Sequence, residues 1–158
     1  MLPALALLAL TQANTAEVKI FVMEDCPIAR KYAPELERLR REFEPKAVNF
    51  TLVQVDPHST KESATKWARE YGLKMSSMLD PKHALAKRFG VTNVPTAVVT
   101  SQGATWYVGR IDDRFPSLGV DRTKSSHHDL KQALGYVLSG KPHVLKRTKA
   151  IGCALPTL

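Results

Sequence analysis

The residue with the most distinctive chemical setting is Cys26, which follows the apolar run of residues 18–23 and directly precedes Pro27. The run is typical of a short buried strand, and proline is well tolerated in the first turn of a helix. We therefore expect Cys26 to lie where a strand ends and a helix begins. There the unpaired amides and the helix dipole favour thiolate over thiol, which is the condition for a nucleophilic cysteine. A buried structural thiol is the alternative interpretation.

The second of the two cysteines, Cys153, lies far along the chain in a basic C-terminal tail. A Cys-x-x-Cys dithiol is excluded, because Ala29 stands where its second cysteine would be and has no sulfur to attack a mixed disulfide. Three roles stay open for Cys153: a disulfide with Cys26, a resolving thiol, and an idle tail cysteine. A tail of this length can fold back across the first cysteine.

Apolar periodicity and turn residues predict the elements that position these thiols. Strands are expected at residues 18–23 and 48–55, and a hairpin at residues 96–100 and 105–108. Four helices are expected: one after Pro27, one with a capping box formed by Ser59 and Glu62, one at 81–89 with Asp80 as N-cap, and one at 126–138. The order β-α-β-α-α-β-β-α predicts an α/β fold with crossover helices and an antiparallel hairpin.

The chain has 158 residues of ordinary globular composition and a net charge of +8. The apolar run at residues 2–10, with Ala13 and Ala16 as cleavage positions, is typical of a signal peptide and too short to span a membrane. We therefore predict a signal peptide at 1–16, one domain at 17–140 and a basic tail at 141–158. Export to the periplasm or the extracellular space would place the cysteines in an oxidising compartment, where a disulfide can persist.

These features resemble the thioredoxin-like fold. That fold places a proline eight positions after its first redox cysteine, as Pro34 follows Cys26, and the stretch Phe-Gly-Val-Thr-Asn-Val-Pro-Thr resembles its cis-proline segment. The resemblance implies a three-layer α/β sandwich with a mixed central sheet and helices on both faces, in which Pro95 is cis and faces Cys26. It also implies a substrate groove lined by Pro27, Val94 and Thr96.

Three sequence blocks resemble exported redoxins of the alkyl hydroperoxide reductase and thiol-specific antioxidant family. They are Asp-Cys-Pro-Ile-Ala-Arg-Lys-Tyr-Ala-Pro-Glu at 25–35, Gly-Arg-Ile-Asp-Asp-Arg at 109–114, and Gly-Cys at 152–153. The fold implied by the resemblance brings Arg110 near the central strands, where it would stabilise a Cys26 thiolate; a solvated arginine is the alternative. Peroxiredoxins carry Pro-x-x-x-Thr-x-x before the peroxidatic cysteine, whereas this chain has Lys19 and Met23 at the two specified positions.

Other function classes find little support in the residues. Copper-delivery proteins of the same fold use two cysteines four positions apart, and Arg30 occupies the second position here. The chain has no nucleic-acid recognition motif, phosphate loop, hydrolytic triad or pair of catalytic carboxylates. We therefore expect no metal, no cofactor, no nucleic-acid partner and no integral membrane segment. The histidines are interpreted as solvated or structural: His58, His83, His127, His128 and His143.

The leading hypothesis from the sequence is an exported thiol-dependent redox protein. Cys26 would attack a disulfide or an oxidised sulfur or peroxide, Pro95 would shape the groove, and Cys153 would resolve the adduct. The substrate would be a thiol or disulfide protein, or a peroxide. Two alternatives remain, a peroxiredoxin-like thiol peroxidase and a non-catalytic thioredoxin-fold binding module. The oligomeric state is left open.

Overall fold

Six strands form one mixed sheet in a computed structural model that describes residues 15–158. The central strand β1 (Ala16–Val22) is parallel to β2 (Val48–Gln54) and antiparallel to β5 (Thr96–Ser101). The order across the sheet is β3-β2-β1-β5-β6-β7. The outer strands are β3 (Ser76–Leu79), β6 (Ala104–Gly109) and β7 (Lys146–Arg147).

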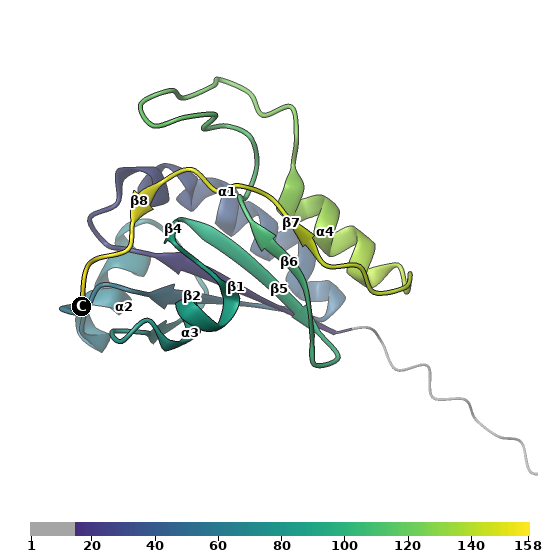
Figure 1. Ribbon diagram of the computed structural model, residues 1–158, viewed down its shortest axis with the longest axis horizontal. Coiled ribbons are helices and arrows are strands. Elements are labelled where there is room, and N and C mark those ends of the chain that lie inside the picture. Colours follow the sequence, from purple (N-terminus) through teal and green to yellow (C-terminus); the bar gives the residue numbers. More distant parts are fainter. Residues whose placement is uncertain (1–14) are drawn as a thin grey trace, which may run out of the picture.

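Helices cover both faces of this sheet, as the sequence predicted (Figure 1). In the view of Figure 1, α3 lies in front of the sheet and α1 lies behind it. α4 lies beside α1, and Lys131 of α4 pairs with Glu42 of α1 at 2.8 Å. The helices are α1 (Pro27–Phe43), followed by the 3₁₀ turn η1 (Glu44–Lys46), then α2 (Lys61–Glu70), α3 (Ala84–Phe89) and α4 (Asp129–Leu138).

The core forms where the apolar stripe of α1 meets the central strands. Val18, Ile20 and Val22 lie on one face of β1 and are fully buried, and Phe21 on the opposite face is buried as well. Leu36 and Leu39 of α1 are also buried, as expected for an amphipathic helix that packs on a sheet. This packing fixes the end of β1 and the beginning of α1, between which Cys26 lies.

Three predicted helix starts were wrong by one to three residues. The capping box of α2 is formed by Thr60 and Ser63 rather than by Ser59 and Glu62, and the Ser59 hydroxyl donates to the Glu24 carboxylate instead. Asp80 does accept hydrogen bonds from the amides of Leu85 and Ala86, but α3 begins only at Ala84. The helix at residues 126–138 likewise begins later, at Asp129. The local sequence offered several polar residues that could cap each helix. Hydrogen bonds within the folded structure decided which of these residues does so.

The predicted signal peptide falls almost entirely on residues 1–14, outside the described residues. Ala16 is the first residue of β1, where it pairs with Val48 and its amide donates to the carbonyl of Ala47. Cleavage after Ala13 would therefore leave β1 complete, whereas cleavage after Ala16 would remove one pair of the ladder. None of the helices in residues 15–158 combines the length and apolar character that a membrane crossing requires.

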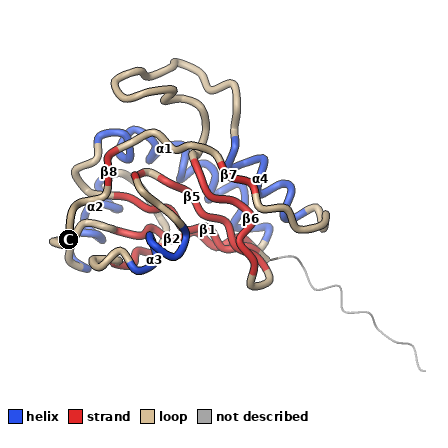
Figure 2. The backbone as a smooth tube through the Cα atoms, in the orientation of Figure 1, coloured by secondary structure: helices blue, strands red, loops and turns tan. Residues whose placement is uncertain are grey.

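The tail, residues 141–158, runs back along the molecule as an extended segment with two short strands (Figure 2). β7 lies parallel to β6 at the edge of the main sheet. β8 (Cys153–Ala154) pairs antiparallel with β4 (Asn93–Val94) in a separate two-stranded sheet. The sequence analysis predicted neither of these two-residue strands. Because they are so short, their position depends on the edge they meet rather than on their own composition.

Candidate redox site

Cys26 is the N-cap residue of α1, with an extended backbone, and Pro27 is the first residue of the helix. This position is the one that the strand and helix patterns predicted. Its carbonyl accepts the hydrogen bond from the amide of Arg30, which begins the helix. The side chain is only 1% exposed, and its thiol lies 3.5 Å from the carbonyl oxygen of Val94. The sulfur therefore faces β4, which directly precedes Pro95.

The peptide bond between Val94 and Pro95 is cis, which is the conformation that the resemblance implied. Of the other residues expected in a groove, Pro27 is exposed, whereas Val94 and Thr96 are buried. The Thr96 hydroxyl donates to the carbonyl oxygen of Asn93 at 2.6 Å. Thr96 therefore holds the bend around Pro95 in shape.

The C-terminal tail occupies the edge of β4 beside Cys26. Val94 pairs with Cys153 and Asn93 with Ala154 in an antiparallel register. The amide of Leu155 donates to the carbonyl oxygen of Thr92 at 3.2 Å, and the Asn93 side-chain amide donates to the carbonyl oxygen of Ala150 at 2.6 Å. The tail is thus added as a strand to the segment that precedes the cis-proline.

This pairing brings the two thiols together within one chain. The Cys153 thiol donates to the Cys26 sulfur, and the two sulfur atoms are 2.6 Å apart. Both cysteines are free thiols, and a disulfide, with a bond of about 2.05 Å, requires only a small further approach. Burial, together with the neighbouring Cys26 sulfur and Asp25, raises the pKa of Cys153 to about 12. Cys153 therefore keeps its proton at neutral pH.

Two glycines make room for the tail. A Cβ atom at Gly152 would lie 1.8 Å from the carbonyl oxygen of Val94, and one at Gly109 would lie 2.1 Å from the hydroxyl of Thr148. Both distances are far below any contact that a side chain tolerates, so the tail can pass only because these positions lack a side chain. Gly109 and Gly152 belong to the second and third sequence blocks, which therefore share one structural purpose.

Arg110 lies in a network that ties the end of β6 to α4 and to the tail. Its guanidinium pairs with the Asp129 carboxylate at 2.7 Å, and its amide donates to the Thr148 hydroxyl at 3.1 Å. The Tyr107 hydroxyl lies within hydrogen-bond distance of the same hydroxyl and donates to the carbonyl oxygen of Arg110. These contacts give Arg110 a role in holding the tail, and the stabilisation of a Cys26 thiolate stays a prediction.

The acidic residues after Arg110 hold the long loop that precedes α4. Asp113 accepts from the amides of Ser126 and His127 and pairs with Arg122. The two amides and the nearby positive charges lower the pKa of Asp113. Asp113 therefore holds residues 122, 126 and 127 of the loop together.

One group of potential metal ligands lies within the described residues, at Glu35, Asp112 and His128, whose ligand atoms lie within 4.8 Å of one another. The Asp112 carboxylate already accepts hydrogen bonds from the hydroxyls of Tyr32 and Ser125. It also accepts from the amide of Arg114. The carboxylate is therefore engaged in holding the loop.

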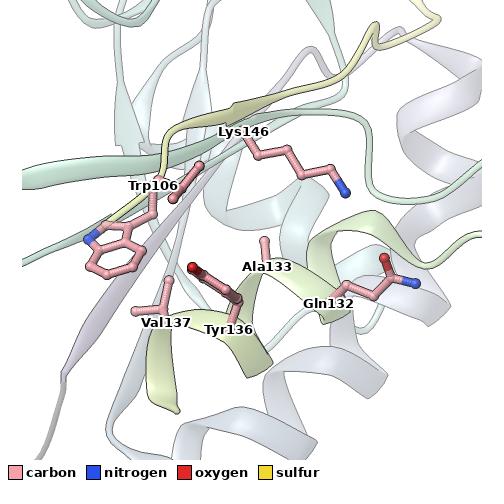
Figure 3. Close-up of a pocket in the computed structure, with 7 residues that line it drawn as sticks. Trp106, Gln132, Ala133, Tyr136, Val137 and Lys146 are labelled. Carbon is pink, nitrogen blue, oxygen red and sulfur yellow. The ribbon is translucent and has the colours of Figure 1, made fainter. Parts of the chain in front are cut away.

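A separate cavity of about 320 Å³ lies between α4, β6 and the start of the tail (Figure 3). The rings of Trp106 and Tyr136 lie beside Val137 at one end, and Gln132 and Lys146 lie at the other. None of the residues that line it carries a thiol. The cavity is thus distinct from the pair of cysteines.

The AhpC/TSA family model matches residues 9–108, which is more than half of the chain. The chain belongs to the AhpC/TSA family. The match includes Cys26 and Pro95 and ends just before Gly109. No curated protein matches the sequence. The family assignment therefore rests on the part of the chain that carries the first thiol, and the tail with Cys153 lies beyond it.

Solved structures confirm the thioredoxin-like α/β fold. An uncharacterized conserved protein from Geobacillus kaustophilus is 25% identical, with a TM-score of 0.77 over 92% of this chain and 79% of that one. A hypothetical protein from Sinorhizobium meliloti 1021 is 22% identical, with a TM-score of 0.75 over 90% and 80%. A secreted Mycobacterium tuberculosis disulfide oxidoreductase homologous to Escherichia coli DsbE is 17% identical, with a TM-score of 0.55 over 77% and 81%.

Several residues that shape the site were not singled out from the sequence. Asn93 and Thr148 hold the tail through a side-chain amide and a hydroxyl, and the chain around them gives no local signal of that role. A usable signal was present in Gly109 and Gly152, because a glycine that is not in a turn often marks the close approach of another backbone. Both glycines stood in the quoted sequence blocks without an assigned purpose.

Proposed function

We propose that this AhpC/TSA family member is an exported thiol-dependent redox protein with Cys26 as the attacking thiol and Cys153 as the resolving thiol. The observation that carries the proposal is the 2.6 Å distance between the two sulfur atoms, across 127 positions of sequence. A second thiol at this place does what the missing cysteine at position 29 would do in a Cys-x-x-Cys motif. The pair supports chemistry that a single cysteine cannot complete.

The reaction proceeds in two exchanges. The Cys26 thiolate attacks one sulfur of a substrate disulfide, which forms a mixed disulfide and releases the other substrate sulfur as a thiol once it takes up a proton. Cys153 then loses its proton and attacks the Cys26 sulfur, which forms the Cys26–Cys153 disulfide and releases the second substrate thiol. The substrate disulfide is reduced by two electrons and the protein is oxidised by two. An external thiol reductant restores the starting dithiol.

The raised pKa of Cys153 supports this division of roles. Because the thiolate is the nucleophile, a raised pKa disfavours Cys153 as the first attacker on an external substrate. Cys26 at the helix N-terminus is therefore the better placed group for the first attack, and Cys153 needs to attack only after a mixed disulfide has replaced the Cys26 thiolate.

Thiol peroxidase activity is the second candidate, and membership of the AhpC/TSA family favours it. In that reaction the Cys26 thiolate attacks a peroxide oxygen, the O–O bond breaks, and water or an alcohol leaves once the released oxygen takes up a proton. The resulting Cys26 sulfenic acid then condenses with Cys153 to a disulfide with loss of water. Lys19 and Met23 replace the proline and threonine of the peroxiredoxin pattern. This difference favours disulfide exchange over peroxide reduction.

Export is the remaining part of the proposal. It is supported by the apolar run at residues 2–10 and by the similarity to a Mycobacterium tuberculosis disulfide oxidoreductase that is secreted. In an oxidising compartment the Cys26–Cys153 disulfide would be the resting state between encounters with a reductant. A single thioredoxin-fold domain with one such pair is sufficient for this cycle.

The order of attack can be tested with Cys153→Ser and Cys26→Ser and a small aromatic disulfide that releases a coloured thiolate. The native protein should release two thiolates and form an internal disulfide, whereas Cys153→Ser should release one and retain the other half as an adduct on Cys26. Cys26→Ser should react at least 100-fold more slowly at pH 7. Equal rates for the two variants, or an adduct found on Cys153 in the native protein, would overturn the proposal.

Hydrogen peroxide distinguishes the peroxidase alternative with the same variants. If peroxide converts Cys26 of Cys153→Ser to a sulfenic acid faster than the aromatic disulfide modifies it, peroxide reduction is the primary reaction. A Cys26 thiol that reacts with neither reagent faster than a free cysteine would instead indicate the binding module. Mass spectrometry of the non-reduced protein identifies each product.

A further inference from the structure

The tail shields the sulfur that an external substrate has to reach. Cys26 is 1% exposed, and its sulfur has hydrogen-bond contacts with the carbonyl of Val94 and the thiol of Cys153. β8 also uses the edge of β4, so the backbone groups beside Cys26 are already paired. A substrate that approaches as an extended chain would have to take this same edge, which is how strand-adding partners bind to sheets.

We propose that the edge of β4 is a peptide-binding site that residues 151–155 of the tail occupy in the absence of substrate. The substrate that competes for this edge is an extended segment with glycine directly before its cysteine. This inference rests on the proposed function, and it adds the substrate class. The tail sequence Ile-Gly-Cys-Ala-Leu is the model for the partner, because it places a cysteine sulfur 2.6 Å from the Cys26 sulfur.

The glycine requirement follows from the backbone around the cis-proline. A Cβ at position 152 would lie 1.8 Å from the oxygen and 2.6 Å from the carbon of the Val94 carbonyl, and 3.1 Å from the nitrogen of Pro95. These are backbone atoms, which cannot rotate away as the end of a side chain can. Any strand that follows the register of β8 therefore meets the same obstacle at the residue before its cysteine.

The tail is held unevenly, which lets this segment leave while the rest stays. The hydroxyl of Thr148 contacts Tyr107 and Arg110, its amide donates to the carbonyl of Val108, and the Ala150 carbonyl accepts from Asn93. Beyond Ala150 the tail is held by the two-residue ladder of β8, one hydrogen bond from the Leu155 amide and the contact between the two thiols. The partly buried side chains of Ile151 and Leu155 also pack against the core. A ladder of two residue pairs contributes little free energy, so it opens readily.

β8 and the substrate segment then bind in turn to the edge of β4. β8 leaves β4 in the dithiol protein, a partner segment that carries a disulfide pairs with β4, and Cys26 attacks the partner's cysteine and releases the other sulfur as a thiol. The partner strand leaves the edge, β8 returns, and Cys153 attacks the Cys26 sulfur and releases the partner's second thiol. The anchor at Thr148 keeps Cys153 near the site throughout, which favours the resolving step through a high effective concentration.

Two peptides test the glycine requirement on the full-length Cys153→Ser variant. Ile-Gly-Cys-Ala-Leu and Ile-Ala-Cys-Ala-Leu each carry the coloured aromatic thiol as a mixed disulfide, and glutathione gives their intrinsic reactivity. We expect Cys26 to react at least tenfold faster with the glycine peptide after this correction. Equal rates, while the small aromatic disulfide still modifies Cys26, would overturn the inference and leave the proposed function intact. No reaction of Cys26 with any of the three would overturn both.

A second variant tests the occupant itself. Gly152→Ala in the Cys153→Ser background should expel β8 from β4 and increase the rate with the glycine peptide about tenfold, because the competing strand is gone. Thr157→Ala, at an exposed position past β8, is the matched control and should leave the rate unchanged. An unchanged rate in Gly152→Ala, with native-like circular dichroism, would show that the tail does not compete for this edge.

Discussion

The two cysteines meet at one point but are held by different kinds of structure. Cys26 lies between a central strand with one fully buried face and a 17-residue helix whose apolar face is part of the core. Cys153 lies in a strand of two residues that touches the molecule at its edge. The first thiol is positioned by the whole domain, whereas the second is positioned by a few hydrogen bonds and two glycines.

This difference matches what each thiol is proposed to do. An attacking group benefits from a fixed geometry, since misplacement of the reacting atoms is costly. A resolving group has to withdraw while the substrate is bound and to return afterwards, so it belongs on a segment of low local stability. The measurements below test whether the region of Cys26 is as rigid, and the tail as weakly held, as this comparison requires.

The largest expected effect is in the core behind Cys26. Leu36→Ala should lower the free energy of unfolding by about 3 kcal/mol, because Leu36 is fully buried in α1 and truncation leaves a cavity. Leu155→Ala, in the tail, should lower it by about 1 kcal/mol or less, because that side chain is partly exposed. Urea denaturation measures both. Similar losses in the two variants would show that the tail is part of the same cooperative core.

The next effect concerns the carboxylate that ties α1 to the segment before β3. Glu37 is 8% exposed and accepts two hydrogen bonds from Arg40 and one from the amide of Lys74. The hydrogen bonds from Arg40, and then that of Lys74, lower the pKa of Glu37 from 4.5 to about 2. Glu37→Gln should therefore cost about 2 kcal/mol at pH 7.

The sign of the pH dependence follows from the lowered pKa. The folded state binds this proton more weakly than the unfolded state, so the stabilisation by Glu37 is complete above about pH 5. It is lost as the pH falls from 4.5 towards 2. The difference in unfolding free energy between the native protein and Glu37→Gln should shrink over that range. Glu70→Gln, in an exposed pair with Lys66, is the control and should change stability by less than about 0.5 kcal/mol at any pH.

The smallest expected change in stability is at the anchor of the tail. Gly109→Ala should displace Thr148, since the added Cβ would lie 2.1 Å from its hydroxyl, at a global cost of about 1 kcal/mol. The local effect should be larger, with alkylation of Cys153 accelerated about fivefold. Gly135→Ala in α4 is the matched control, because nothing lies within 4 Å of its added Cβ. An unchanged rate of Cys153 alkylation in Gly109→Ala would show that β8 alone keeps Cys153 in position.

The strand before Cys26 and the helix after it were predictable from local signals, which are an apolar run and Pro27 after the cysteine. The cis bond before Pro95 was implied by the resemblance to the thioredoxin-like fold. The capping residues of α2 and the start of α3 were predicted less well, because the side chains of Ser59 and Asp80 each have several possible hydrogen-bond partners. Which partner each one takes depends on the position of Glu24 and of α3 in the folded structure.

The sequence by itself determined that Cys26 would end a buried strand and begin a helix, and that position 29 could not resolve an adduct. Only the tertiary structure decided that Cys153 is the thiol beside it. The reason is physical: local periodicity reports on a chain's neighbours within a few residues, whereas the pairing of Val94 with Cys153 joins segments 59 positions apart. That pairing exists because two glycines and an open strand edge leave room for a returning chain, and such room is a property of the assembled fold.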